Sequence, residues 1–370
     1  MQQHLDAHQR PPESIKAVYK KYQKMKLKEL EQDTEIINLA HGEDSPLPAN
    51  SKMRVVRSIP KEQVRAAFQA LAGTVEHAQD DDLKDLSDIN VYEHEDMPGL
   101  HLIPALLPPP HQRTLLSHLL HTTLSHPSHT TNLHAHYTLS YPSPTPSFFS
   151  HPPTSQTPIA NPLTPSLHRP LPITPLLCKK LRWITLGAQY NWTRKAYPDT
   201  PAPPFPPLIK DLLAPLFPDT QAQAAIVNVY SPGDTLALHR DVAEHCGRGL
   251  VGLSLGCEGI FVIGSEEGLS CDDDDEDNDD DDDDDNGDRK EHPHPQTLTI
   301  RLNSGSAVYM SGPSRFAWHG VAQIIPGSCP DYLADWPAGS RDTHQEDYEA
   351  WRGWMGTKRI NLNVRQMWDA

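Results

Sequence analysis

Two histidines and one aspartate have the residue types and the spacing of a metal site. His239 and Asp241 lie two residues apart at the end of a strand-like stretch, and alternate residues of an extended chain point to the same face. His319 ends another strand-like run 80 residues later and precedes Gly320, where the backbone can approach a neighbour closely. Two imidazoles and one carboxylate on one side of an octahedral iron leave positions open for reactants. The sequence therefore predicts a facial triad for iron.

A strand near the C-terminus has the side chains to hold an anion beside this metal. In residues 359–365, which read RINLNVR, the polar residues occupy the odd positions and the aliphatic residues the even ones. Arginine and asparagine are planar hydrogen-bonding groups that suit a carboxylate, although an ordinary half-exposed strand would also alternate. Arg359 and Arg365 lie roughly 20 Å apart along an extended strand. We therefore expect one to anchor the far end of a dicarboxylate and the other to act near the metal.

A 2-oxo dicarboxylate fits this arrangement. Its 2-oxo acid end can chelate the metal through two oxygens and leave one position for O₂, while its remote carboxylate needs a fixed cation such as Arg359. Asn228 and Tyr230 lie two residues apart on the strand that leads to the metal pair, and both can donate hydrogen bonds to the same molecule. We expect Fe(II), 2-oxoglutarate and O₂ as cofactor and cosubstrates.

Three ordered motifs between residues 228 and 365 resemble the AlkB family of nucleic-acid dealkylases. They are NxYxPGxxLxxHxD, SRxxxHG and RxNxNxR. Residues 181–198, LRWITLGAQYNWTRKAYP, look like the family's segment before the barrel, and residues 98–104 look like its entry strand. The resemblance covers about residues 98–370 and is nearest to the eukaryotic branch called AlkB homologue 1.

The resemblance implies roles for particular residues. Those implied to bind iron are His239, Asp241 and His319; those implied to bind or frame 2-oxoglutarate are Asn228, Tyr230, Arg359, Asn361 and Arg365; those implied to lie over a flipped nucleobase are Trp192 and Tyr197. An aromatic face can stack on such a base. Arg240 stands between two of the implied ligands without an assigned role, and Glu244 and His245 are expected to be surface residues.

The implied reaction is oxidative demethylation of N-alkylated nucleobases in RNA, such as transfer RNA, or in single-stranded DNA. Hydroxylation of an N-methyl carbon gives a hemiaminal that releases formaldehyde, with succinate and CO₂ as by-products. Two alternatives stay open: a 2-oxoglutarate oxygenase that acts on a protein side chain or a small molecule, and an inactive jelly roll that binds RNA or protein. We expect a monomer.

Short strand-like runs must position these residues. Seven runs, rich in β-branched or aromatic residues and separated by Gly, Pro or Ser, predict a β-sandwich or jelly roll. They cover residues 224–230, 250–255, 259–263, 297–302, 307–310, 316–325 and 359–367. The expected fold is α+β, with a double-stranded β-helix (jelly-roll) core at 221–370, flanking N-terminal helices and a disordered acidic insertion at 266–294.

The acidic insertion explains most of the net charge. Residues 272–288 contain 14 acidic and no basic residues, so the rest of the chain accounts for only about −3 of the net charge of −17. A block of like charge is not expected to pack. The overall sign therefore says little about partners.

The N-terminal 220 residues carry weaker signals. Residues 15–30 have near-helical apolar spacing with lysines on the other faces, which predicts a docked surface helix; contact of the lysines with phosphates is the alternative. A helix is also expected at 61–72. Residues 101–178 are rich in Pro and contain ten of the 21 histidines, and we expect loops there. We expect an N-terminal extension at 1–92 and a Pro/His-rich segment with a nucleotide-recognition lid at 93–220.

Five scattered cysteines without a CxxC pair argue against a disulfide framework. The N-terminus lacks a secretion signal, and no window approaches the roughly 20 apolar residues of a membrane span. We expect a cytoplasmic or nuclear protein without a membrane segment, with the mitochondrion left open.

Overall fold

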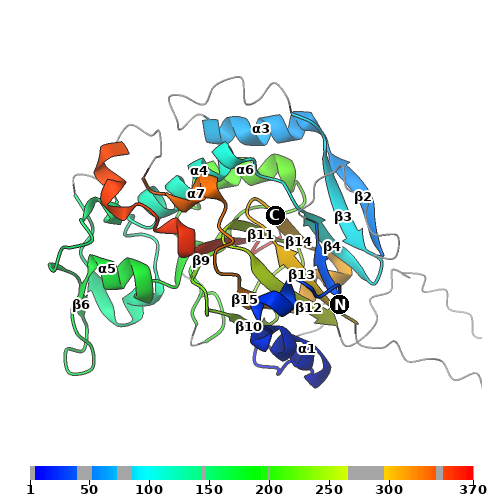
Figure 1. Cartoon of the computed structure of the whole chain (residues 1–370), viewed down its shortest axis with the longest axis horizontal. Helices are drawn as coiled ribbons and strands as arrows, with labels where there is room; N and C mark the ends of the chain where they lie inside the picture. Colours follow the sequence, from blue (N-terminus) through cyan, green and yellow to red (C-terminus); the bar gives the residue numbers. More distant parts are fainter. Residues whose placement is uncertain are drawn as a thin grey trace, which may run out of the picture.

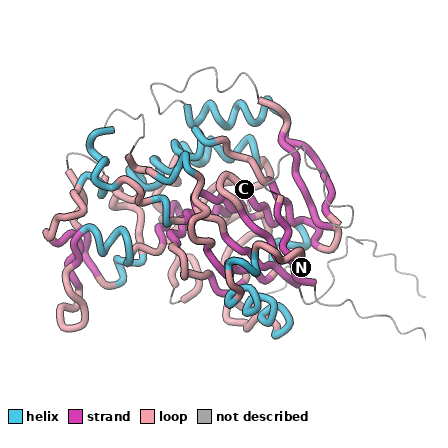
Figure 2. Tube along the Cα trace, viewed as in Figure 1, coloured by secondary structure: helices cyan, strands magenta, loops and turns pink. Residues whose placement is uncertain are grey.

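The structure is a computed structural model that describes residues 5–39, 52–72, 86–143, 147–192, 194–198, 201–265, 296–338 and 345–369 (Figure 1). The predicted acidic insertion at 266–294 lies outside the described residues. Most strands lie in the middle and on the right of the view, with helices above, below and to the left of them (Figure 2). None of the described helices is long and apolar enough to cross a lipid bilayer.

The larger sheet has eight strands, and every neighbouring pair is antiparallel. In spatial order they are β2 (Met53–Ile59), β3 (Ile89–His94), β4 (Met97–Ile103), β14 (Ala307–Met310), β11 (Leu250–Gly256), β16 (Arg359–Arg365), β9 (Ala224–Tyr230) and β8 (Trp183–Gly187). Every residue of β9 is buried. Its sequence, AAIVNVY, is therefore almost continuously apolar instead of alternating.

The smaller sheet has five strands. In order they are β1 (Ile36–Asn38), β13 (Gln296–Leu302), β12 (Gly259–Ser265), β15 (Trp318–Ile324) and β10 (Leu236–His239). Only β1 and β13 run parallel, while the other pairs are antiparallel. The seven predicted strands are confirmed as β9 and β11 to β16.

Apolar side chains pack on both faces of the larger sheet. Between the two sheets lie residues such as Val308 and Phe261. On the outer face, Ile360, Leu362 and Val364 of β16 join a second core, so the predicted alternation of this strand is confirmed. Mixed helices with two mainly antiparallel sheets are consistent with the predicted jelly-roll core.

Helices cover the outer face of the larger sheet. They are α3 (Lys61–Ala72), α4 (Pro109–Ser117) and α6 (Pro207–Leu216) (Figure 1). Leu212 of α6 and Phe68 of α3 are fully buried there. The helix predicted at 61–72 is confirmed. The short helix α7 (Asp331–Ala334) follows β15 and contacts α4.

The predicted N-terminal helix is present as α1 (Glu13–Lys24), followed by the single turn α2 (Leu27–Leu30). The buried residues Tyr19 and Tyr22 of α1 pack against β12 and β15. The hydroxyl of Tyr19 also donates to the carbonyl oxygens of Leu236 and Val321, at 3.1 and 3.3 Å. The helix is therefore docked, and it braces the two strands of the smaller sheet that carry the histidines.

The strands β2 and β3 were not predicted, and both begin within the expected N-terminal extension at 1–92. Only the two ends of β2 are buried, because it is the edge strand of its sheet. Such a strand shows no apolar alternation. The expected boundary between residues 92 and 93 falls inside β3, which pairs with β4 across it.

The Pro/His-rich segment is more regular than expected. It contains α4, a π-helical stretch (His118–Thr123), α5 (Ile173–Pro175) and a three-stranded sheet of β5 (Tyr137–Leu139), β6 (Pro158–Pro162) and β7 (Leu171–Pro172). The expectation of loops was wrong because prolines here lie at helix starts and in very short strands, where a missing N–H is tolerated. His121 is stacked on Tyr348, and burial lowers the pKa of His121 to about 4. Such histidines act as neutral packing groups.

Candidate metal centre

The structure brings His239, Asp241 and His319 together. His239 is the last residue of β10 and pairs across the sheet with His319 of β15. One ligand atom from each of the three residues lies within 4.8 Å of the others. The Nε2 atoms of His239 and His319 lie 4.0 and 3.6 Å from oxygens of Asp241. The three side chains can therefore share one ion.

Both imidazoles are held in the same way. Their Nδ1 atoms lie 2.9 and 3.0 Å from the carbonyl oxygens of Ala237 and Ala317. Since a carbonyl oxygen only accepts, each Nδ1 carries the proton and each Nε2 is left with its lone pair. A Cβ on Gly320 would lie 2.6 Å from the Leu236 carbonyl oxygen, so this glycine allows the two histidine strands to approach.

The charges of the triad suit a metal cation. Burial, followed by the neighbouring ring of His319, lowers the pKa of His239 to about 4. Burial by itself would raise the pKa of Asp241, but the guanidinium of Arg365 and the two histidines hold it well below its usual range. Neutral imidazole and ionised carboxylate are the forms that coordinate metals.

Arg365, at one end of β16, is surrounded by acidic and phenolic groups. Its guanidinium donates to the Tyr197 hydroxyl at 3.0 Å, and it lies 3.4 Å from both Asp241 and Glu244 carboxylates. Burial would lower the pKa of Arg365, but Asp241, Tyr197 and Glu244 raise it. This cation is neutralised within the described part of the protein.

Arg359, at the other end of the same strand, has different surroundings. It is 1% exposed, and its guanidinium donates to the Cys257 and Leu302 carbonyl oxygens and the Ser254 hydroxyl, at 3.0, 3.3 and 2.8 Å. All three acceptors are neutral. Burial lowers the pKa of Arg359 to about 10. A buried cation whose hydrogen-bond acceptors among the described residues are all neutral suits an anionic ligand.

Two buried hydrogen-bond donors at the Arg359 end of β16 also suit an anionic ligand. Among the described residues, Arg359 Nε and the hydroxyl of Tyr230 have no hydrogen-bond partner, and the two residues are paired across β16 and β9. An unsatisfied buried polar group costs about 1–3 kcal/mol. A carboxylate is a suitable acceptor for both donors.

A narrow cavity between the two sheets connects Arg359 with the metal triad. Its lining includes Asp241 and His319 at one end and Arg359 with Ser254 at the other, and Asn361 lies along it. The predicted polar face of β16 is thus turned inward and not toward solvent. Asn228 pairs with Asn361 across the strands but lines the neighbouring cavity.

That neighbouring cavity, of about 240 Å³, opens beside His239. Trp192 and Tyr190 line it; Trp192 is 44% exposed and lies 4.9 Å from the ring of Trp183. Tyr197 is 7% exposed and lies behind, with its ring 5.1 Å from that of Tyr190. The structure therefore offers Trp192 and Tyr190 to a ligand, whereas Tyr197 reaches the site through Arg365.

Sequence reasoning missed Glu244 and Arg315. The expectation that Glu244 is a surface residue was wrong, because its side chain is 1% exposed and is paired with Arg315 at 3.1 Å and with Arg365. Arg315 also donates to the carbonyl oxygens of Asp241 and Arg248, at 2.8 and 2.6 Å. The position of Arg315 inside the SRxxxHG motif was the one feature of the sequence that could have indicated a role for it. His245 is exposed, as expected.

Arg240 is turned away from the triad. Its guanidinium lies over the ring of Trp318, 4.7 Å from the centroid, and donates to the side chain of Gln9. Together with Ala7, whose carbonyl oxygen accepts from Lys195 at 2.9 Å, this contact holds the N-terminal segment at the mouth of the cavity.

The comparisons with known proteins agree with this geometry. Residues 99–365 match the family described as 2OG-Fe(II) oxygenase superfamily. The chain is 40% identical to the N6-methyladenosine RNA demethylase ALKB1 of Pyricularia oryzae, over 98% of both chains. It is 46% identical to the N6-methyladenosine RNA demethylase ALKBH of Cryphonectria parasitica, over 64% of this chain and 100% of that one. It is 38% identical to the tRNA demethylase abh1 of Schizosaccharomyces pombe, over 54% and 57% of the two chains.

The chain therefore belongs to the 2OG-Fe(II) oxygenase superfamily, among the AlkB homologues. The family and the enzyme class predicted from the three motifs are confirmed. Members of this superfamily share the use of Fe(II), 2-oxoglutarate and O₂ as a general property.

Proposed function

We propose that this protein is an Fe(II)- and 2-oxoglutarate-dependent dioxygenase that removes N-alkyl groups from nucleobases in RNA or DNA. The observation that carries the proposal is a metal-binding triad joined by an internal cavity to a buried arginine with only neutral partners. The two facing sheets form the double-stranded β-helix that presents these groups to one another.

The described residues divide the work. His239, Asp241 and His319 hold the iron through two imidazole nitrogens and one carboxylate. Arg359 and the Tyr230 hydroxyl hold the remote carboxylate of 2-oxoglutarate, and Asn361 lies along the cavity that receives it. When bound, iron and 2-oxoglutarate supply the activation of O₂. The protein's part is to orient these groups and to exclude water.

The substrate side is the open cavity beside His239. A base turned out of its strand can stack on Trp192, as the aromatic lining permits. Insertion of one oxygen atom of O₂ into an N-methyl C–H bond gives a hemiaminal, and the other oxygen atom enters succinate as 2-oxoglutarate loses CO₂. The hemiaminal then breaks its C–N bond to release formaldehyde. The names of the relatives, which are RNA and tRNA demethylases, support a nucleic-acid substrate.

The test is formaldehyde release from methylated substrates. The Fe(II)-loaded protein is incubated with methyladenine-containing RNA, with methylated single-stranded DNA and with methylated histone or ribosomal peptides, and the products are identified by mass spectrometry. We expect demethylation of a nucleic acid. Turnover of a peptide alone would contradict the proposed substrate.

A matched pair of tryptophans sharpens the test. Trp192 and Trp368 are similarly exposed, at 44% and 45%, but only Trp192 lines the cavity. Because base stacking on an aromatic ring contributes about 1–3 kcal/mol, Trp192→Ala should lower kcat/KM for the oligonucleotide by roughly tenfold. Trp368→Ala should leave it unchanged, and equal effects of the two variants would argue against stacking at Trp192.

A further inference from the structure

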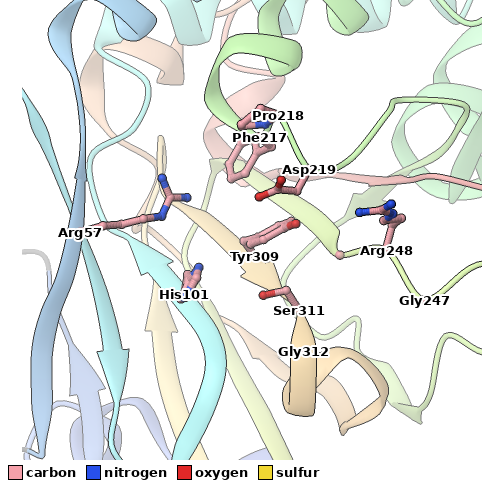
Figure 3. Close-up of a pocket in the computed structure, with 11 residues that line it drawn as sticks. Arg57, His101, Phe217, Pro218, Asp219, Gly247, Arg248, Tyr309, Ser311 and Gly312 are labelled. Atoms are coloured by element: carbon pink, nitrogen blue, oxygen red, sulfur yellow. The ribbon is translucent and has the colours of Figure 1, made fainter. Parts of the chain in front are cut away.

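A third cavity lies on the outer face of the larger sheet and has no part in the proposed reaction. Its volume is about 370 Å³, within the usual range of small-ligand sites. Its lining includes Arg57, His101, Asp219, Arg248, Tyr309 and Ser311 (Figure 3). We call it the Arg57–Arg248 cavity. Tyr309 belongs to the core on the outer face of the sheet. Its neighbour Val308 lines the narrow cavity that connects Arg359 with the metal triad.

The centre of this cavity is firmly built. The Tyr309 hydroxyl is bonded to the Thr220 hydroxyl at 3.0 Å, and its ring lies 5.3 Å from that of Phe217. A Cβ on Gly249 would lie 2.3 Å from the Tyr309 ring, so the ring lies directly against the backbone. The cavity therefore has a fixed aromatic wall.

Charged groups surround this wall. Arg57 and Arg248 lie on opposite sides of Tyr309, and the carboxylate of Asp219 lies between them (Figure 3). The side chain of Arg57 is exposed and makes no hydrogen bond or ion pair with any described residue. The nearest acidic partner of Arg248 is Asp369, at 3.7 Å. Since Tyr309 and Asp219 lie between the two guanidiniums (Figure 3), each guanidinium suits a phosphate group of its own.

The Arg57–Arg248 cavity is close to the open cavity beside His239. Glu244 lines the cavity beside His239 and Gly247 lines the Arg57–Arg248 cavity, and three residues of extended chain span at most about 11 Å. Arg315 fixes the segment between them, because it donates to the carbonyl oxygens of both Asp241 and Arg248. A nucleic-acid strand whose target base lies in the open cavity beside His239 can therefore also reach the Arg57–Arg248 cavity.

We propose that the Arg57–Arg248 cavity binds one ribonucleotide unit of an RNA substrate, next to the target base. The two guanidiniums hold the phosphodiester groups on either side of this unit, and the Asp219 carboxylate between them accepts a hydrogen bond from its ribose 2′-hydroxyl. The Asp219 carboxylate repels phosphate, but a ribose hydroxyl beside the phosphate can donate a hydrogen bond to this carboxylate. The 2′-hydroxyl is the group that distinguishes RNA from DNA. The inference rests on the proposed function and makes RNA the preferred substrate.

The first experiment measures the phosphate contact. Binding of a short methyladenine-containing oligoribonucleotide to the full-length, Fe(II)-loaded protein is followed by fluorescence anisotropy at several salt concentrations, without O₂. Arg57→Ala and Arg248→Ala should each weaken binding by roughly fivefold. Each should also make the slope of log K against log salt shallower by about 0.7.

The control is Arg169→Ala, which removes the same charge from an exposed position between β6 and β7. Figure 1 shows β6 at the opposite side of the molecule from β2, the strand that carries Arg57. The control variant should leave affinity and slope unchanged. If Arg169→Ala weakens binding as much as Arg57→Ala, or if the two cavity variants bind normally, the cavity does not hold the phosphate.

The second experiment measures the hydroxyl contact. Asp219→Asn should weaken binding of the oligoribonucleotide relative to the oligodeoxyribonucleotide of the same sequence, because an amide is a poorer acceptor than a carboxylate. Equal changes for RNA and DNA would overturn the assignment of Asp219. These readouts are affinities, so they are separate from turnover. If no methylated nucleic acid releases formaldehyde, the proposed function is contradicted. If the cavity variants bind RNA normally, only the assignment of the Arg57–Arg248 cavity is contradicted.

Discussion

The two ends of β16 carry arginines that are equally buried but differ in their partners. Arg365 lies within 3.4 Å of Asp241 and Glu244, whereas the guanidinium of Arg359 donates only to neutral oxygens. Removing one partner of a buried ion pair leaves an uncompensated charge, so Arg365 is needed for the resting structure. Arg359 has its charge available for a ligand. We therefore propose that β16 combines a structural cation, Arg365, with a cation that binds the cosubstrate, Arg359.

The largest loss of activity is expected on substitution of the metal triad, which lies at the Arg365 end of β16. His239→Ala or Asp241→Ala should lower 2-oxoglutarate decarboxylation at least about a thousandfold, since the metal supplies several kcal/mol of catalysis. The exposed neighbour His245→Ala is the control and should retain activity. Normal decarboxylation in either ligand variant would show that the triad does not hold the catalytic metal.

The next effect separates the two arginines by stability. Arg365→Ala should lower the free energy of unfolding of the metal-free protein by about 3–5 kcal/mol, because two buried carboxylates lose their shared cation. Arg359→Ala should lower it less, since no carboxylate is left behind. Chemical denaturation of both variants measures the difference, and a larger loss for Arg359→Ala would reverse the comparison.

The same pair differs in cosubstrate binding. Arg359→Ala should raise the KM for 2-oxoglutarate by roughly 10- to 100-fold, as expected for a hydrogen-bonded charge worth about 1.5–3 kcal/mol. Arg359→Lys should restore part of the affinity, because it restores the charge without the planar fork. An unchanged KM in a folded Arg359→Ala variant would place the remote carboxylate elsewhere.

The smallest effect concerns the phenol that supports Arg365. Tyr197→Phe removes one hydrogen bond of 3.0 Å to this guanidinium and should lower the free energy of unfolding by about 0.5–1.5 kcal/mol. The KM for 2-oxoglutarate should stay the same, because the other end of β16 is untouched. A large rise in KM would instead make Tyr197 part of the cosubstrate site.

The core strands and the approach of His239 to Asp241 were predictable because their signals are local. Alternation in RINLNVR separated an apolar face from a polar one, and the HxD spacing placed His239 beside Asp241. The buried partners were harder to predict. Glu244 follows Asp241 closely in sequence, but only the approach of Arg315, 71 residues away, makes it a buried residue.

The Pro/His-rich segment shows the same limit. Its histidines resemble a polar tract in sequence, yet His121 lies between aromatic rings from distant parts of the chain. Such burial depends on tertiary packing, and no periodicity reports it. Likewise β2 is a strand because β3 pairs with it, not because its own residues alternate.

An anaerobic titration of the Fe(II)-loaded protein with 2-oxoglutarate tests the central claim most directly. The chelate of Fe(II) with the 2-oxo acid gives a weak visible charge-transfer absorption. We predict that this band appears in the wild-type protein, is absent from Asp241→Ala, and needs a higher 2-oxoglutarate concentration in Arg359→Ala. A folded wild-type protein that binds Fe(II) but never develops the band would contradict the account.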